Sequence, residues 1–212
     1  MQIAVLVFDR FTALDAVGPY EVLSRLPGAE VVFTAERRGP VRTEVGSLAV
    51  VADAALDEVT RPGVVVIPGG PGQRDHMGEG PVLEWLRAVD ATTEWTTSVC
   101  TGSLLLAAAG LLRGRRAVSH WLTLDELPAF GAVPVEERFV ADGKYLTAAG
   151  VSAGVDMALA LAGRIAGDTV AQAVQLGIEY APQPPYGSGT PATAPAPLVE
   201  ALRARRAEIV GG

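Results

Sequence analysis

Cys100 is the only cysteine of the chain, and its surroundings in the sequence could make its thiol reactive. The residues before it, 95–99, predict a strand, and the apolar run at 103–109 predicts a helix. A thiol at a sharp strand-to-helix turn lies beside the free N–H groups of the helix start, which favour the thiolate. Gly102 is expected to permit the bend. Free cysteines are also common as small buried hydrophobic residues, so the interpretation as a nucleophile depends on this context.

Gly69 and Gly70 could stabilise negative charge near that thiol. They follow a strand predicted at residues 63–67. Because glycine has no side chain, its amide N–H group can approach a ligand closely. The alternative is an ordinary turn. In open α/β sheets ligands bind beyond the carboxyl ends of the strands, which is where both the glycines and Cys100 are expected.

Asp15 is a candidate proton carrier for the thiol. Two negative charges side by side are unfavourable, so the productive arrangement of Asp15 and Cys100 is a pair that shares one proton. We expect Asp15 on a short turn before a helix that begins at Pro19, because proline disrupts the interior of a helix. A plain turn or capping residue is the alternative interpretation of Asp15.

His120, which is followed by Trp121, is the other group that could act on Cys100 as a base. The separation of the two residues in the sequence does not show whether they meet. A structural histidine at the mouth of the sheet or at an interface is the alternative. The residues predict neither a metal site nor a cofactor.

Strands and helices alternate along the chain, which predicts an α/β fold with a mostly parallel sheet covered by helices on both faces. Asp142 and Gly143 predict a hairpin between residues 138–140 and 145–147. The other main strands are predicted at 3–8, 30–35, 63–67 and 95–99, and the helices at 81–89, 103–109, 152–165 and 168–178, the last capped by Asp168. The prolines of residues 181–197 predict an arm without regular structure, and a helix is expected at 198–210.

Length and composition indicate one globular domain, residues 1–212. Hydrophobic residues make up 49% of the chain and charged residues 19%, which supports a large packed core. The formal net charge of −7 disfavours binding to nucleic acid or to anionic membranes. No apolar run approaches the length of a membrane-spanning helix, and the first residues lack the features of a signal peptide. We therefore expect a cytoplasmic protein without a nucleic-acid or membrane partner.

The segment Ser98-Val99-Cys100-Thr101-Gly102-Ser103 carries the strongest resemblance to a known family. Together with Gly69-Gly70 and with His120-Trp121, it resembles the ThiJ/PfpI superfamily over nearly the whole chain. The resemblance implies a flavodoxin-like sandwich in which the cysteine occupies a strained strand-to-helix nucleophile elbow. It also implies a homodimer, with the proline-rich arm ordered against the partner.

Within that superfamily the chain resembles the isocyanide hydratases. The match rests on Leu14-Asp15-Ala16-Val17-Gly18-Pro19 and on the tail at residues 179–186. Members that resemble peptidases or glyoxalases typically carry a histidine after the cysteine, where this chain has Thr101, and a glutamate from the first helix. Ligand-sensing transcription regulators share the Cys-Thr-Gly and His-Trp features but add a DNA-binding domain.

The resemblance to isocyanide hydratases implies a small isocyanide as substrate and a specific mechanism. Cys100 would attack the isocyanide carbon to give a thioimidate, which water would convert to an N-substituted formamide. Asp15 would carry the protons, and Thr101 would orient the carboxylate and the substrate. The residues implied in substrate binding are Gly69, Gly70, His120, Trp121, Ala149, Gly150 and Val151. Another enzyme of the superfamily, glyoxalase-like or amidase/peptidase-like, and a non-catalytic ligand or redox sensor are the alternatives.

Overall fold

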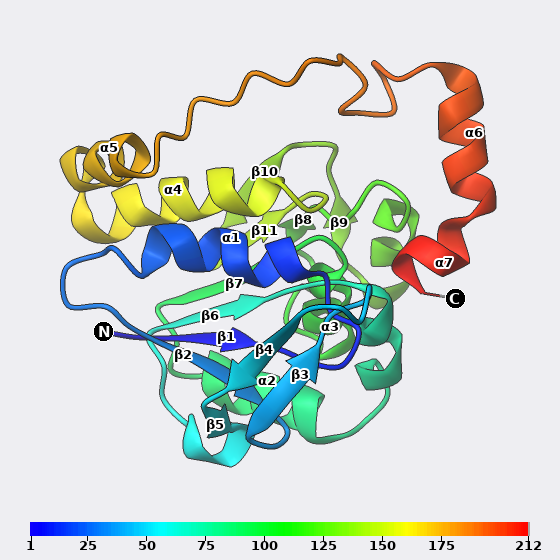
Figure 1. Ribbon diagram of the computed structural model, residues 1–212. Helices are drawn as coiled ribbons and strands as arrows, with labels where there is room; N and C mark the ends of the chain where they lie inside the picture. Colours follow the sequence, from blue (N-terminus) through cyan, green and yellow to red (C-terminus); the bar gives the residue numbers. More distant parts are fainter. Residues whose placement is uncertain (212) are drawn as a thin grey trace.

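A seven-stranded sheet forms the centre of the computed structural model, which describes residues 1–211 (Figure 1). The strand order is β10-β11-β7-β6-β1-β2-β5, and every neighbouring pair is parallel except the hairpin of β10 and β11. In that order the strands are β10 (Phe139–Asp142), β11 (Tyr145–Ala148), β7 (Trp95–Val99), β6 (Val64–Ile67), β1 (Gln2–Leu6), β2 (Glu30–Ala35) and β5 (Ala54–Ala55). The predicted flavodoxin-like, mostly parallel sheet and its hairpin are confirmed.

Strands β6 and β1, at the centre of the sheet, are almost entirely apolar. β6 is Val-Val-Val-Ile and buried at all four positions, and β1 is buried from Ile3 to Leu6. Branched side chains suit a pleated surface that is covered on both faces, because they pack well on either side. These strands fix the points at which the loops of the site leave the sheet.

Helices cover both faces of the sheet (Figure 1). α1 (Ala13–Leu23), α4 (Ala153–Ala166) and α5 (Asp168–Gly177) lie together on one face, whereas α2 (Pro81–Asp90) and α3 (Gly102–Ala108) lie on the other. Smaller elements are the hairpin of β3 (Gly39–Arg42) and β4 (Ala49–Ala52), the pair of β8 (Arg116–Ala117) and β9 (Val133–Pro134), and the 3₁₀ helices η1 (Leu56–Glu58), η2 (Pro71–His76) and η3 (Leu124–Phe130).

The prediction that Asp15 lies on a turn before a helix starting at Pro19 is wrong. Both residues are inside α1, and Pro19 leaves the main-chain carbonyl of Asp15 without its usual helical donor. Close packing of α1 on α4 compensates for this loss. Gly18 allows the approach, since a Cβ atom there would lie 3.1 Å from Cγ2 of Val155.

The carboxyl-terminal part differs from the prediction in three places. Asp168 is the first residue of α5 rather than its cap, because Gly167 holds the capping position with φ 87°. Residues 180–195 form no helix or strand, as predicted, but α6 (Ala196–Ala204) begins inside the predicted arm. The terminal helix is broken at Arg205, after which α7 (Arg206–Val210) begins. In Figure 1 the irregular segment crosses from α5 to α6.

Within residues 1–211 no helix is both long enough and apolar enough to cross a membrane.

Candidate active site

Cys100 forms the sharp turn between β7 and α3. Its φ of 58° lies in the left-handed region, which costs a residue with a side chain about 1–2 kcal/mol. Hydrogen bonds on both sides hold this conformation. The Cys100 N–H group donates to the carbonyl oxygens of Ala148 and Ala149, each at 3.1 Å, and its carbonyl accepts from the hydroxyls of Ser103 and Ser119 at 3.3 and 3.2 Å.

The bend needs the missing side chain of Gly102 rather than its conformational freedom, because the positive φ of the turn belongs to Cys100. Gly102 lets the start of α3 touch the end of β6. A Cβ atom at Gly102 would lie 2.8 Å from the carbonyl oxygen of Pro68 and closer still to that of Ile67. The glycine therefore sets how near α3 and its preceding cysteine lie to the sheet.

The carboxylate of Asp15 lies against the loop that follows β6. Its Oδ2 atom accepts a hydrogen bond of 2.9 Å from the Gly69 amide, and its buried Oδ1 atom has no hydrogen-bond partner among the residues that the structure describes. Gly69 could not carry a side chain, since a Cβ atom would lie 2.5 Å from the backbone nitrogen of Thr101. The loop is thus in main-chain contact with the turn at Cys100.

Asp15 and Cys100 form a buried pair in which burial disfavours the ionised form of both side chains. Burial raises the pKa of Asp15 to about 8, although hydrogen bonds from the Gly69 amide and with the Cys100 thiol oppose the rise. Burial also raises the pKa of Cys100 well above its ordinary value, and the charge of Asp15 adds to it. The neighbouring amides of Thr101 and Val151 lower the pKa of Cys100 and so act the other way. Burial therefore outweighs the helix start, which alone was expected to favour the thiolate.

Thr101 and Gly70 are joined by a hydrogen bond. The Gly70 amide donates to Oγ1 of Thr101 at 3.0 Å, so this amide and the Gly69 amide are both already engaged with protein atoms. The φ of Gly70 is 120°, and a Cβ atom there would lie 2.5 Å from the backbone nitrogen of Thr12. The two glycines organise Asp15 and Thr101, while their predicted contact with substrate stays a prediction.

Residues 149–151 lie beside Cys100, and their role as a pocket wall stays a prediction. The carbonyl of Ala149 accepts from the Cys100 amide, and the Val151 amide lowers the pKa of Cys100. Gly150 touches His120, since a Cβ atom at Gly150 would lie 2.7 Å from Cδ2 of that ring.

His120 is a neutral ring packed against Gly150. Burial lowers its pKa to about 4, and its Nδ1 atom accepts a hydrogen bond of 3.2 Å from the Leu122 amide. With Nδ1 occupied in this way, the neutral ring carries its proton on Nε2, and this form favours the structural interpretation over a base for Cys100.

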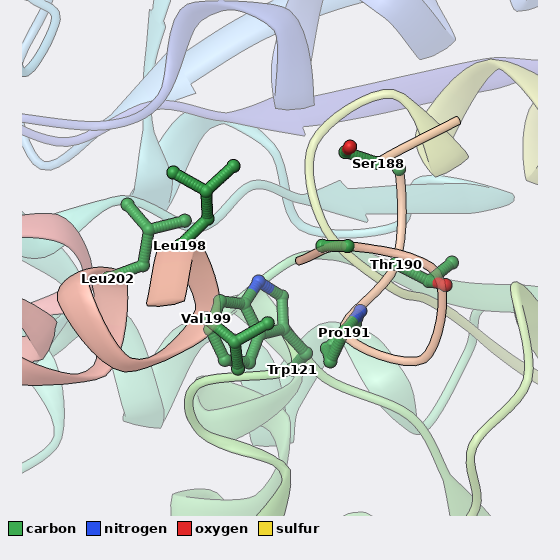
Figure 2. A pocket seen from close by; sticks show the side chains of 9 residues that line it. Trp121, Ser188, Thr190, Pro191, Leu198, Val199 and Leu202 are labelled. Carbon is green, nitrogen blue, oxygen red and sulfur yellow. The ribbon is translucent and has the colours of Figure 1, made fainter. Parts of the chain in front are cut away.

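Trp121 lies at a different cavity. Figure 2 shows its side chain between the irregular segment and α6, with Pro191 and Val199 beside it. This cavity, of about 110 Å³, is lined by Trp121 and by residues 188–202, and neither Cys100 nor Asp15 belongs to its lining. The predicted contact of Trp121 with the substrate therefore stays a prediction.

Ser119 was missed by reasoning from the sequence. Its hydroxyl binds the carbonyl of Cys100 and lies 2.9 Å from the hydroxyl of Thr123, so it supports the strained turn from a separate loop. Its position next to His120 was the only available signal.

Comparison with known proteins supports the family resemblance. The DJ-1/PfpI family matches residues 1–164. A protein named isonitrile hydratase, from Pseudomonas putida, is 42% identical over 98% of this chain and 90% of its own length. The crystal structure of a ThiJ/PfpI family protein from Pseudomonas syringae covers 99% of this chain and 87% of that chain, with a TM-score of 0.95 and 38% identity. A transcriptional regulator of Pseudomonas aeruginosa, CdhR, is 33% identical over 63% of this chain, but this match covers only 40% of the regulator.

Proposed function

This chain belongs to the DJ-1/PfpI family, and from that premise we propose that it is an isocyanide hydratase, an enzyme that adds water to an isocyanide (isonitrile) to give an N-substituted formamide. The observation that carries the proposal is the buried pair of Cys100 and Asp15, in which a thiol and a carboxyl with a pKa of about 8 lie in contact. A nucleophile and a proton carrier of this kind are what the addition of water across an isocyanide carbon requires. Similarity to the Pseudomonas putida protein along nearly the whole chain supports the same choice.

In the first step of the proposed reaction the Cys100 sulfur bonds to the terminal carbon of the isocyanide. The thiol proton passes to Asp15 and from there to that carbon, which gives a thioimidate with the nitrogen still double-bonded to carbon. The raised pKa of Asp15 suits this role, because a carboxyl that titrates near neutrality can both accept a proton and return it.

In the second step water attacks the thioimidate carbon. Asp15 takes one proton of the water and passes it to the nitrogen, which leaves a tetrahedral intermediate with a hydroxyl group on the carbon. The carbon–sulfur bond then breaks as the carbonyl of the formamide forms, and Asp15 carries the hydroxyl proton to the leaving sulfur. The sum is one isocyanide and one water converted to one formamide, with Cys100 and Asp15 restored.

The test is hydration of a panel of aryl and alkyl isocyanides by the wild-type chain and by Cys100→Ser. The serine hydroxyl is a weaker nucleophile with a much higher pKa, so formamide production should fall to background while the circular dichroism spectrum stays unchanged. Mass spectrometry during turnover should find an adduct with the mass of the whole isocyanide on wild-type Cys100 and none on the variant. Undiminished hydration by Cys100→Ser would rule out the nucleophile assignment.

Asp15→Asn tests the proton carrier. It preserves the shape of the side chain but cannot accept and return a proton, so the rate should fall by roughly 10²–10⁴. The matched control is Asp57→Asn on the exposed 3₁₀ helix η1, which should keep full activity. Thr101→Val should cost less than Asp15→Asn, because the Thr101 amide at the sulfur remains. If the wild type ignores every isocyanide of the panel and consumes methylglyoxal, a glyoxalase-like activity replaces the proposal.

A further inference from the structure

The carboxyl-terminal helices lie beyond residues 1–164, the part that the family match covers, and α7 packs against η2, the 3₁₀ helix that follows Gly70. Val210 is 1% exposed, and a Cβ atom at Gly211 would lie 2.7 Å from both the carbonyl oxygen of Pro71 and Cγ of Arg74. The end of the described chain is therefore in close contact with the loop that carries the two glycines of the site.

Glu126 of η3 joins that loop to α7. It accepts two hydrogen bonds from the guanidinium of Arg74, at 2.6 and 2.5 Å, and one of 2.5 Å from the guanidinium of Arg206. The side chains of Glu126 and Arg74 are only 20% and 26% exposed, so water and salt screen the pair less than an ordinary surface ion pair. Burial alone would raise the pKa of Glu126, but the bonds from the two arginines hold it below its ordinary value.

Arg74 is tied in turn to the glycines. It belongs to η2, which starts directly after Gly70, and the amide of Gln73 donates to the carbonyl of Gly70 at 3.1 Å. The Gly69 amide donates to Asp15. The connection from α7 to the carboxyl of the buried pair thus runs through the hydrogen bonds of Glu126, the main chain of η2 and the amide of Gly69.

We propose that Glu126 is a positioning residue of the site: by binding Arg74 and Arg206 together, it fixes the loop at Gly69 on the carboxyl of Asp15, and it makes the carboxyl-terminal helix α7 a working part of the site. The effect of Glu126 on turnover rests on the proposed function, whereas its effect on the pKa of Asp15 does not. The titration of the Asp15 carboxyl allows that effect to be measured without any isocyanide.

The sign of the effect distinguishes positioning from plain electrostatics. Glu126→Gln removes a negative charge and leaves Arg74 without its carboxylate partner, whereas Arg206 keeps Asp125. The loss of negative charge would favour ionisation of the pair at lower pH. Loss of positioning acts the other way, because a loosened Gly69 amide stabilises the Asp15 carboxylate less. The two titratable side chains that act on the pKa of Asp15 are Cys100 and Glu44, and both are unchanged in this variant.

The experiment follows the titration of the Asp15 carboxyl by ¹³C NMR of the aspartate-labelled chain, with its signal identified by its loss in Asp15→Asn. We expect the midpoint of the Asp15 titration to rise in Glu126→Gln by about half a pH unit or more, and by less in Glu126→Asp, which keeps the charge but shortens the reach. With an isocyanide substrate, kcat should fall more than KM changes. Glu126→Asp also serves if Glu126→Gln does not fold.

Glu79→Gln is the matched control, because Glu79 also binds an arginine, Arg87, with two hydrogen bonds but lies on the exposed surface. It should leave the midpoint of the Asp15 titration unchanged. A midpoint in the folded Glu126 variants that stays at the wild-type pH or moves lower would overturn the proposal. A raised midpoint in a protein that hydrates no isocyanide would sustain the positioning and reject the enzyme activity.

Discussion

The carboxyl of Asp15 is fully buried, and this makes the stability of the fold depend on pH. Its pKa is 3.8 in the ordinary state and about 8 in the folded chain. Between these values the folded chain keeps a proton that the unfolded chain has lost. The contribution of the neutral carboxyl is therefore complete below about pH 4 and is lost as the pH rises towards 8.

Asp15→Asn should abolish this dependence. The wild type should lose free energy of unfolding between pH 5 and pH 8, by at most about 4 kcal/mol from this group, because an ionised carboxylate is costly to bury. The amide carries no charge, so the variant should gain on the wild type as the pH rises. Urea unfolding at the two pH values measures the difference, with Asp57→Asn as a control that should follow the wild type. Parallel pH profiles for Asp15→Asn and wild type would contradict the buried neutral carboxyl.

At the scale of elements, the position of α3 against β6 depends on one missing side chain. An alanine in a helix is ordinarily about 1 kcal/mol better than glycine. Gly102→Ala should do the opposite and destabilise the protein by about 3 kcal/mol, because its Cβ atom would meet main-chain oxygens of Ile67 and Pro68 that cannot rotate away. Gly177→Ala in α5, where a Cβ atom meets no atom within 4 Å, should be neutral or stabilising. Thermal unfolding compares the melting temperatures of the two variants. Equal melting temperatures would show that α3 can move away from β6 at little cost.

The succession of elements was predictable because apolar runs and turn residues are local signals. β2 and β7 were predicted with their true bounds, and the turn at Cys100 follows from β7 running directly into α3. The helix around Asp15 was missed because Pro19 is a local signal for a helix start, whereas packing of α1 on α4 is a long-range effect that overrides it. No local rule shows which helix face will find such a partner.

The candidate site was predictable in its members but not in their contacts. Cys100, Asp15 and Gly69 were singled out from the sequence, yet the bond from the Gly69 amide to Asp15 spans 54 positions. The partners of Glu126 lie 52 and 80 positions away, and nothing near Glu126 in the sequence distinguishes it from other surface glutamates. Charges that meet only after folding leave no periodic pattern.

At the scale of the whole molecule, large apolar side chains along the carboxyl-terminal part are exposed to solvent. Tyr186 and Leu176 are both 81% exposed, and α6 exposes Leu198 and Leu202. Exposed apolar side chains gathered on one segment are typical of an association surface. We therefore keep the prediction of a homodimer in which residues 181–197 are ordered against the partner.

Light scattering tests this prediction at micromolar concentration. The wild type should have the mass of two chains, and a variant that combines Tyr186→Ser with Leu198→Ser should shift towards one chain, because it removes apolar area from the surface. Val51→Ser in β4 is a control of similar exposure that lies in another part of the chain. A monomeric wild type, or rapid proteolysis throughout residues 181–197, would reject the dimer.

The glycines around Cys100 also bear on how such proteins diverge. At Gly69, Gly70 and Gly102 even one added methyl group would collide with main-chain atoms, so no side chain can be introduced at these positions to reshape the site. A side chain at any of these positions should therefore cost the site its geometry. We expect differences in substrate preference among such proteins to arise from side chains in the surrounding segments.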